Sequence, residues 1–138
     1  MKRLLLALGL CLTLGSSALS QGPIVGPGNL LICTKIAPMP AGTTGLQQIV
    51  AGVAGQSISV CGWHITNTAA TGTFAFSTGT GSNCGTNTVT PIPAQNVNST
   101  APSADHIDYV TLTLPAGNAL CVNFSVATIA GIVYYTQF

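Results

Sequence analysis

Short runs of alternating apolar and polar residues fill the chain from residue 30 onward, and this pattern constrains the fold more than any other feature. In the segment 119–127, for example, Leu120, Val122 and Phe124 alternate with less apolar residues. Successive residues of a strand point to opposite faces, so such a run indicates a strand that buries one face. No apolar stripe with helical spacing accompanies these runs.

Several segments rich in β-branched and apolar residues are therefore expected to be strands, separated by polar loops at 37–45 and 79–88. Short turns at 68–71 and at "PAGN", 115–118, suggest two hairpins. Strands of this length and spacing without helices predict an all-β fold, an antiparallel β-sandwich of about 7–8 strands with jelly-roll-like topology. The expected strands are 30–36, 46–55, 56–67, 72–78, 106–114, 119–127 and 131–138, with hairpins pairing 59–67 with 72–78 and 106–114 with 119–127.

The first twenty residues have the pattern of a secretory signal peptide. A basic start at Lys2 and Arg3 precedes an apolar run, 4–14, that is shorter than the roughly 20 residues needed to span a bilayer. Small residues lead to Ser20, after which cleavage is expected. The sequence thus predicts a signal peptide at 1–20, a flexible Gly/Pro-rich arm at 21–29 and a single β-sandwich domain at 30–138, in a protein that is secreted, either extracellular or periplasmic.

Charge is nearly absent from the expected mature chain, which keeps Lys35 against Asp105 and Asp108, a formal charge of one minus two, or −1. Phosphate binding needs clustered Lys and Arg, so nucleic acid is excluded as a partner, and so is an anionic membrane surface. A surface with so little charge lacks one common defence against association. The composition therefore favours self-association or a place in a larger protein assembly.

Four cysteines remain after the leader, Cys33, Cys61, Cys84 and Cys121, and in an exported chain they predict two disulfides. Their spacings match no zinc pattern. Four cysteines allow three connectivities, which spacing alone does not resolve. The strand phase favours Cys84 with Cys121, because Cys121 lies on the polar face of its strand and Cys84 in a polar loop, and leaves Cys33 with Cys61 by elimination.

The stretch "SADHID", 103–108, contains both acids of the chain, Asp105 and Asp108, around His106. With His64 they could form a metal site or serve a metal-dependent hydrolase. The alternative is that the aspartates bond to backbone amides at a strand entrance. Neither a nucleophile elbow nor a charged surrounding shell accompanies them. We therefore expect no enzyme activity, no metal and no cofactor.

Among the aromatic residues, Trp63 is expected to point into the core. Tyr134 and Tyr135 are adjacent in an expected strand, so one of them must face outward or into an interface. Tyr109 lies on the polar face of its own expected strand. These three tyrosines form the candidate contact surface for a protein or a glycan.

The succession "QQIVAGVAGQSISVCGWHI", "STGTGSNCGTNT" and "LPAGNALCVNFSVATIAGIVYYTQF" resembles a group of small secreted and phage-associated β-sandwich proteins, among them virion decoration or appendage proteins of tailed phages. The likeness spans roughly 46–138. It implies a module that packs through its sheet faces. The leader and the cysteines set this chain apart from virion proteins, which assemble in the cytoplasm, where disulfides are disfavoured.

Together these features predict a secreted, disulfide-stabilised, non-enzymatic structural or interaction module, part of a surface or virion-like assembly. The first alternative is an extracellular carbohydrate-binding or adhesion module. The second is a metal-dependent hydrolase that uses Asp105, His106 and Asp108.

Overall fold

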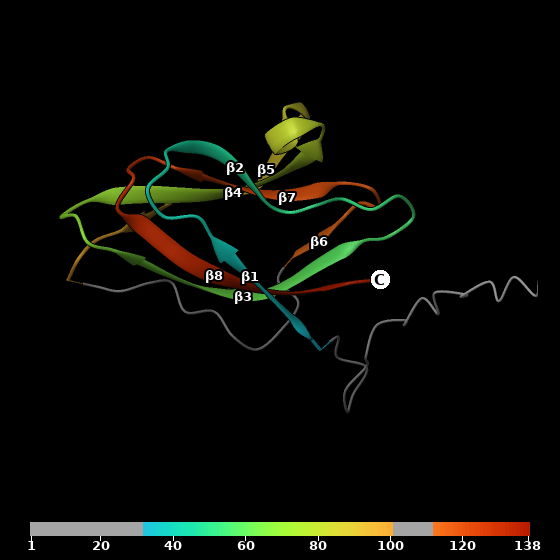
Figure 1. Ribbon diagram of the computed structural model, residues 1–138, viewed down its shortest axis with the longest axis horizontal. Coiled ribbons are helices and arrows are strands. Elements are labelled where there is room, and N and C mark those ends of the chain that lie inside the picture. The colour runs from blue at the N-terminus through green and yellow to red at the C-terminus, as the bar shows by residue number, and fades with distance from the viewer. Residues whose placement is uncertain (1–31, 101–111) are drawn as a thin grey trace, which may run out of the picture.

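The computed structural model describes residues 32–100 and 112–138, and within them eight strands form two four-stranded antiparallel sheets that face each other (Figure 1). A short 3-10 turn, η1 (Ser82–Cys84), lies between the fourth and fifth strands. The strands are β1 (Lys35–Met39), β2 (Gly45–Val50), β3 (Ile58–Asn67), β4 (Gly72–Thr80), β5 (Thr86–Val97), β6 (Leu112–Leu114), β7 (Ala119–Phe124) and β8 (Ile129–Gln137). The prediction of an all-β sandwich is confirmed.

The strand order defines a jelly roll. One sheet has the order β1-β8-β3-β6 and the other has the order β2-β7-β4-β5. The first strand therefore pairs with the eighth, the second with the seventh, the third with the sixth and the fourth with the fifth. This is the pattern of one long hairpin rolled into a double sheet, as in jelly rolls. The predicted topology is confirmed.

Both predicted hairpins are wrong. β3 and β4 lie in opposite sheets, and so do β6 and β7, so the turns at 68–71 and 115–118 carry the chain from one sheet to the other. Alternation specifies which face of a strand is buried, but it does not specify the neighbouring strand. A short turn can close a hairpin or connect two layers, and here it connects layers.

Several strand boundaries differ from the expected ones; β2 ends at Val50 rather than at residue 55, and β8 begins at Ile129 rather than at Gly131. β1 begins at Lys35, within the segment expected as a strand, and runs into the segment expected as a loop. β5, whose sequence contains Pro91 and Pro93, was not among the expected strands. Proline is tolerated on an edge strand, whose outer side donates to no neighbour, and β5 is at the edge of its sheet.

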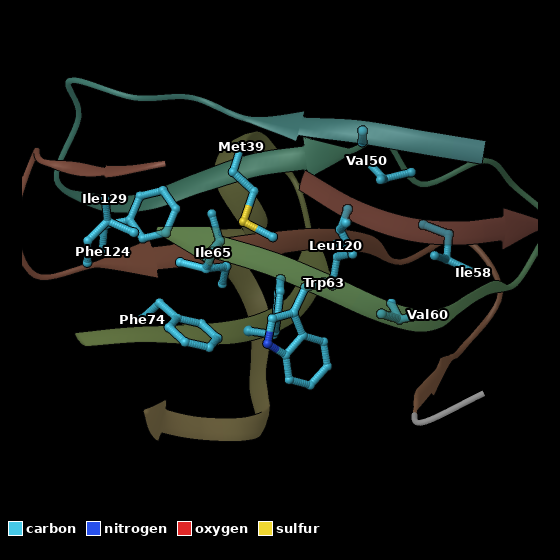
Figure 2. Packing of buried hydrophobic residues seen from close by; sticks show 14 of the residues in the cluster. Met39, Val50, Ile58, Val60, Trp63, Ile65, Phe74, Leu120, Phe124 and Ile129 are labelled. Carbon is cyan, nitrogen blue, oxygen red and sulfur yellow. The ribbon is translucent and has the colours of Figure 1, made fainter. Parts of the chain in front are cut away.

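The core fills the space between the two sheets (Figure 2). At its centre the Trp63 ring lies 5.1 Å from that of Phe76, and the Phe76 ring lies 5.8 Å from that of Phe74 in an edge-to-face contact. Phe74 and Phe76 share the buried face of β4, as their alternation predicts, and Trp63 points inward as expected. Other fully buried side chains are Ile58, Val60, Ile65, Leu114, Leu120, Val122, Phe124, Ile129 and Val133.

Candidate functional site

Two disulfides fasten the sandwich, Cys33–Cys61 and Cys84–Cys121, with Cα–Cα distances of 6.0 and 6.2 Å. They are the two pairs favoured from the sequence. The first joins the segment before β1 to β3, and the second joins η1 to β7. Each closes a loop long enough to stabilise the fold by about 3 to 4 kcal/mol through the entropy of the unfolded chain.

The outward face of the β1–β8 pair carries a small apolar surface. Ile36 pairs with Tyr134 and Pro38 pairs with Ile132, so four side chains form two adjacent cross-strand rows. Ile36 is 61% exposed, Pro38 is exposed, and Tyr134 and Ile132 are half-buried. We call these four residues the β1–β8 patch.

The residues that alternate with the patch residues along β1 and β8 face the core. Val133 is fully buried between Tyr134 and Ile132, and Tyr135 packs against the core cluster. The ammonium of Lys35 lies 5.9 Å from the centre of the Tyr135 ring, a cation–π geometry. Of the two adjacent tyrosines, Tyr134 is thus the one on the outward face.

Several residues proposed from the sequence lie outside the described residues, namely Asp105, His106, Asp108 and Tyr109. His64 is described and stands on the outward face of β3, opposite Ile132. In 32–100 and 112–138, no group of three or more His, Cys, Asp or Glu side chains is placed to hold a metal ion. The predicted convergence of His64 with the "SADHID" residues lies outside the described residues.

Ile36 was not among the predicted contact residues, since the strand was expected at 30–36, with this isoleucine as its last residue. The signal was present in the run from Lys35 to Met39, where Ile36 and Pro38 alternate with Ala37. Once β1 is placed at Lys35–Met39, that alternation puts Ala37 and Met39 inward and leaves Ile36 outward.

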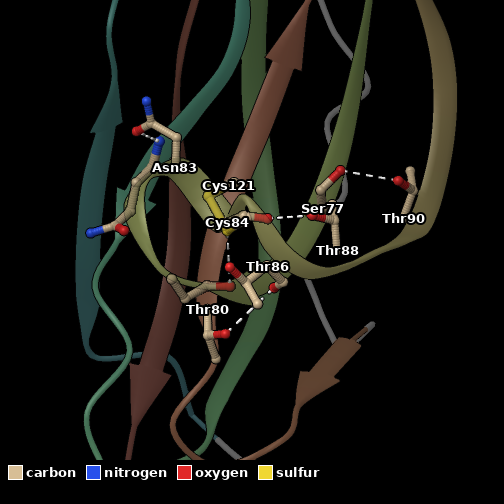
Figure 3. The surroundings of a disulfide bond; sticks show 10 residues. Ser77, Thr80, Asn83, Cys84, Thr86, Thr88, Thr90 and Cys121 are labelled. Atoms are coloured by element: carbon tan, nitrogen blue, oxygen red, sulfur yellow. Dashed lines mark hydrogen bonds between the residues drawn. A yellow bond between two sulfur atoms is a disulfide. The ribbon is translucent and has the colours of Figure 1, made fainter.

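The loop around η1 is the other unusual feature of the surface (Figure 3). Asn83 and Cys84 have positive backbone φ angles of 49° and 56°, and Asn87 has one of 52°. The side-chain oxygen of Asn83 accepts a hydrogen bond from the backbone N–H of Gln48 in β2, at 3.2 Å. The loop thus contacts the edge of the β2-β7-β4-β5 sheet.

The fold and these surfaces define a disulfide-stapled jelly roll with an exposed apolar patch. A scan against protein-family models and searches of curated proteins and of solved structures give no match for this chain. In the described residues, no helix has the length and apolar character needed to cross a membrane.

Proposed function

We propose that this chain is an exported, non-enzymatic structural or interaction module that associates with protein through the β1–β8 patch. The observation that carries the proposal is the exposure of Ile36, at 61%, beside the outward side chains of Tyr134, Pro38 and Ile132. Contiguous exposed apolar side chains on a small protein are typical of contact sites.

The scarcity of charge supports the same proposal. Within the described residues, Lys35 is the one side chain with a permanent charge. Its ammonium lies over the Tyr135 ring, whose side chain is on the opposite side of the β1–β8 pair from the patch. Charged side chains around an apolar patch normally oppose non-specific association, and a patch without them is suited to packing against a neutral partner.

The disulfides and the jelly-roll fold bear on the compartment and the kind of assembly in which this module acts. Disulfides persist in oxidising compartments, which favours export through the N-terminal leader. By analogy with the jelly rolls of viral capsids and lectins, the fold is suited to assembly. With the resemblance to phage-associated proteins, these features favour a place in a surface or virion-like assembly.

Light scattering coupled to size-exclusion chromatography tests the proposal. The mature chain is expected to show a mass that rises above that of one chain as its concentration increases. A single-chain mass at every concentration, with no capture of protein from the exporting cell's surface, would overturn it.

Export is tested separately by expressing the whole chain in an exporting bacterium and determining the N-terminus by mass spectrometry. A chain that starts at Gln21 in the medium or periplasm is expected. Retention of Met1 in the cytoplasm would contradict this part of the proposal.

A glycan-binding role is the second candidate, because the outward Tyr134 ring retains accessible surface on the face of the sheet. Binding on a glycan array that disappears in Tyr134→Ala but persists in Ile36→Lys would favour this role over protein association.

A further inference from the structure

The two sheets have edges that are protected in different ways. Edge strand β1 carries Lys35 and Pro38, and edge strand β5 carries Pro91 and Pro93. Lysine and proline are the usual residues that keep an exposed strand from pairing with another chain. Edge strand β6 spans only three residues, Leu112–Leu114, and a short edge offers little to pair with. Edge strand β2, with the six-residue sequence GLQQIV, contains neither a charged residue nor a proline.

What β2 has instead is the η1 loop beside it, which packs against β2, β4 and β7. An edge strand bonds its single neighbour through alternate residues and leaves other backbone groups without a strand partner. The Asn83 side chain occupies one such group, the N–H of Gln48. A side chain thus takes the place that a carbonyl of an added strand would take.

The loop holds Asn83 in this position at a conformational cost. Positive φ is tolerated by asparagine but is unfavourable for cysteine, and Cys84 has a φ of 56°. Three features of Cys84 stabilise this conformation. The residue is fully buried, its sulfur is bonded to that of Cys121, and its carbonyl accepts a hydrogen bond from the Thr88 hydroxyl (Figure 3). Without the disulfide, the backbone would be free to leave this conformation.

We propose that the η1 loop is a guard on the β2 edge, that the Cys84–Cys121 disulfide latches it, and that the partner it excludes is the β2 strand of a second copy. Two β2 strands related by a two-fold axis would pair antiparallel and extend the sheet across the axis. The strand is uncharged, so no repulsion opposes this pairing. The guarded edge belongs to the sheet opposite the β1–β8 patch, so this inference does not rest on the proposed function.

The test compares the double variant Cys84→Ser/Cys121→Ser with the matched double variant Cys33→Ser/Cys61→Ser, which loses the other disulfide. Both carry Ile36→Lys, which removes association through the patch. Sedimentation velocity is expected to show dimers of the first variant at concentrations on the order of tenfold below those at which the second dimerises. Equal association of the two variants would overturn the proposal, because general destabilisation would then explain it.

Two substitutions at Asn83, each made in the Ile36→Lys chain so that the patch does not contribute, keep the test decisive if loss of a disulfide prevents folding. Asn83→Gly removes the oxygen that accepts the Gln48 N–H while permitting the positive φ, and it is expected to increase dimerisation and the hydrogen-exchange rate of the Gln48 amide in dilute solution. Asn83→Asp, which keeps an acceptor oxygen, should behave as the parent. Adding Gln48→Pro, which removes the donor, is expected to reverse the dimerisation, and persistence of the dimer would overturn the proposal.

Discussion

Ile36 of β1 lies directly opposite Tyr134 of β8 on the outward face of the sandwich. A cross-strand contact of this kind contributes roughly 0.2 to 1 kcal/mol to sheet stability. Ile36 nevertheless remains 61% exposed, whereas the next residue, Ala37, is 6% exposed. Burial of the exposed part of Ile36 against a partner would therefore contribute more free energy than its contact with Tyr134 does.

Thr78 is buried, and its hydroxyl finds no hydrogen-bond partner among the described residues. Replacing a buried, unsatisfied hydroxyl with a methyl group removes a desolvation cost, so Thr78→Val is expected to raise the free energy of unfolding by about 1 to 2 kcal/mol. Urea denaturation measures it. Ser77→Ala serves as the control, because it removes a hydroxyl that is bonded to that of Thr90 at 3.1 Å, and should be destabilising.

Gly131 allows β8 to approach β3 closely. A Cβ atom at this position would lie 2.3 Å from the carbonyl oxygen of His64 and 3.0 Å from the Cα of Ile65, and both are backbone atoms. The strands would have to separate, so Gly131→Ala is expected to cost about 2 to 3 kcal/mol.

Thermal unfolding provides the measurement for Gly131→Ala, and Gly42→Ala provides its control. Gly42 has a φ of 82° but open space around it, so its substitution should cost about 1 to 2 kcal/mol through backbone conformation alone. Equal losses for the two variants would show that close packing at Gly131 is unimportant.

Phe76 is fully buried and touches both Trp63 and Phe74. Truncation to alanine leaves a cavity between the sheets and is expected to cost about 3 to 5 kcal/mol, a large share of the stability of a small domain. Phe76→Leu should cost less, because leucine fills more of the same space. Urea denaturation gives the comparison, provided that the free energy of unfolding of both variants depends equally on urea concentration. Equal midpoints for the two variants would count against this packing.

Ionic strength should have little effect on stability. In the described part of the chain Lys35 is the sole permanently charged side chain, so there are few charge pairs for salt to screen. The melting temperature is expected to be nearly constant up to about 1 M NaCl. It should rise in sulfate, which strengthens apolar burial. A large fall in the melting temperature as NaCl is added would reveal an ion pair that contributes to stability.

The sequence predicted well which residues of a strand face the core and which face outward. Alternation in 119–127 correctly places Leu120, Val122 and Phe124 inward and Asn123 outward. The same reasoning put Cys121 on the outer side of its strand, where it meets Cys84. These are local properties, which depend on the period of two along a strand.

Strand partners and the contact patch could not be predicted in the same way. The neighbours of β3 are β6 and β8, which are distant in sequence, and no local pattern encodes that pairing. Ile36 could be recognised as outward only after β1 was placed correctly. The β5 strand was not predicted, and its prolines are tolerated because β5 lies at the edge of its sheet.

Sedimentation velocity on three proteins tests the central claim most directly: the parent chain, Ile36→Lys and Val89→Lys. Ile36 and Val89 are 61% and 58% exposed and lie on edge strands of opposite sheets, so the two lysines perturb the surface to a similar extent. We expect the parent and Val89→Lys to associate with rising concentration and Ile36→Lys to remain a single chain. Association of Ile36→Lys to the same extent as the parent would contradict the account.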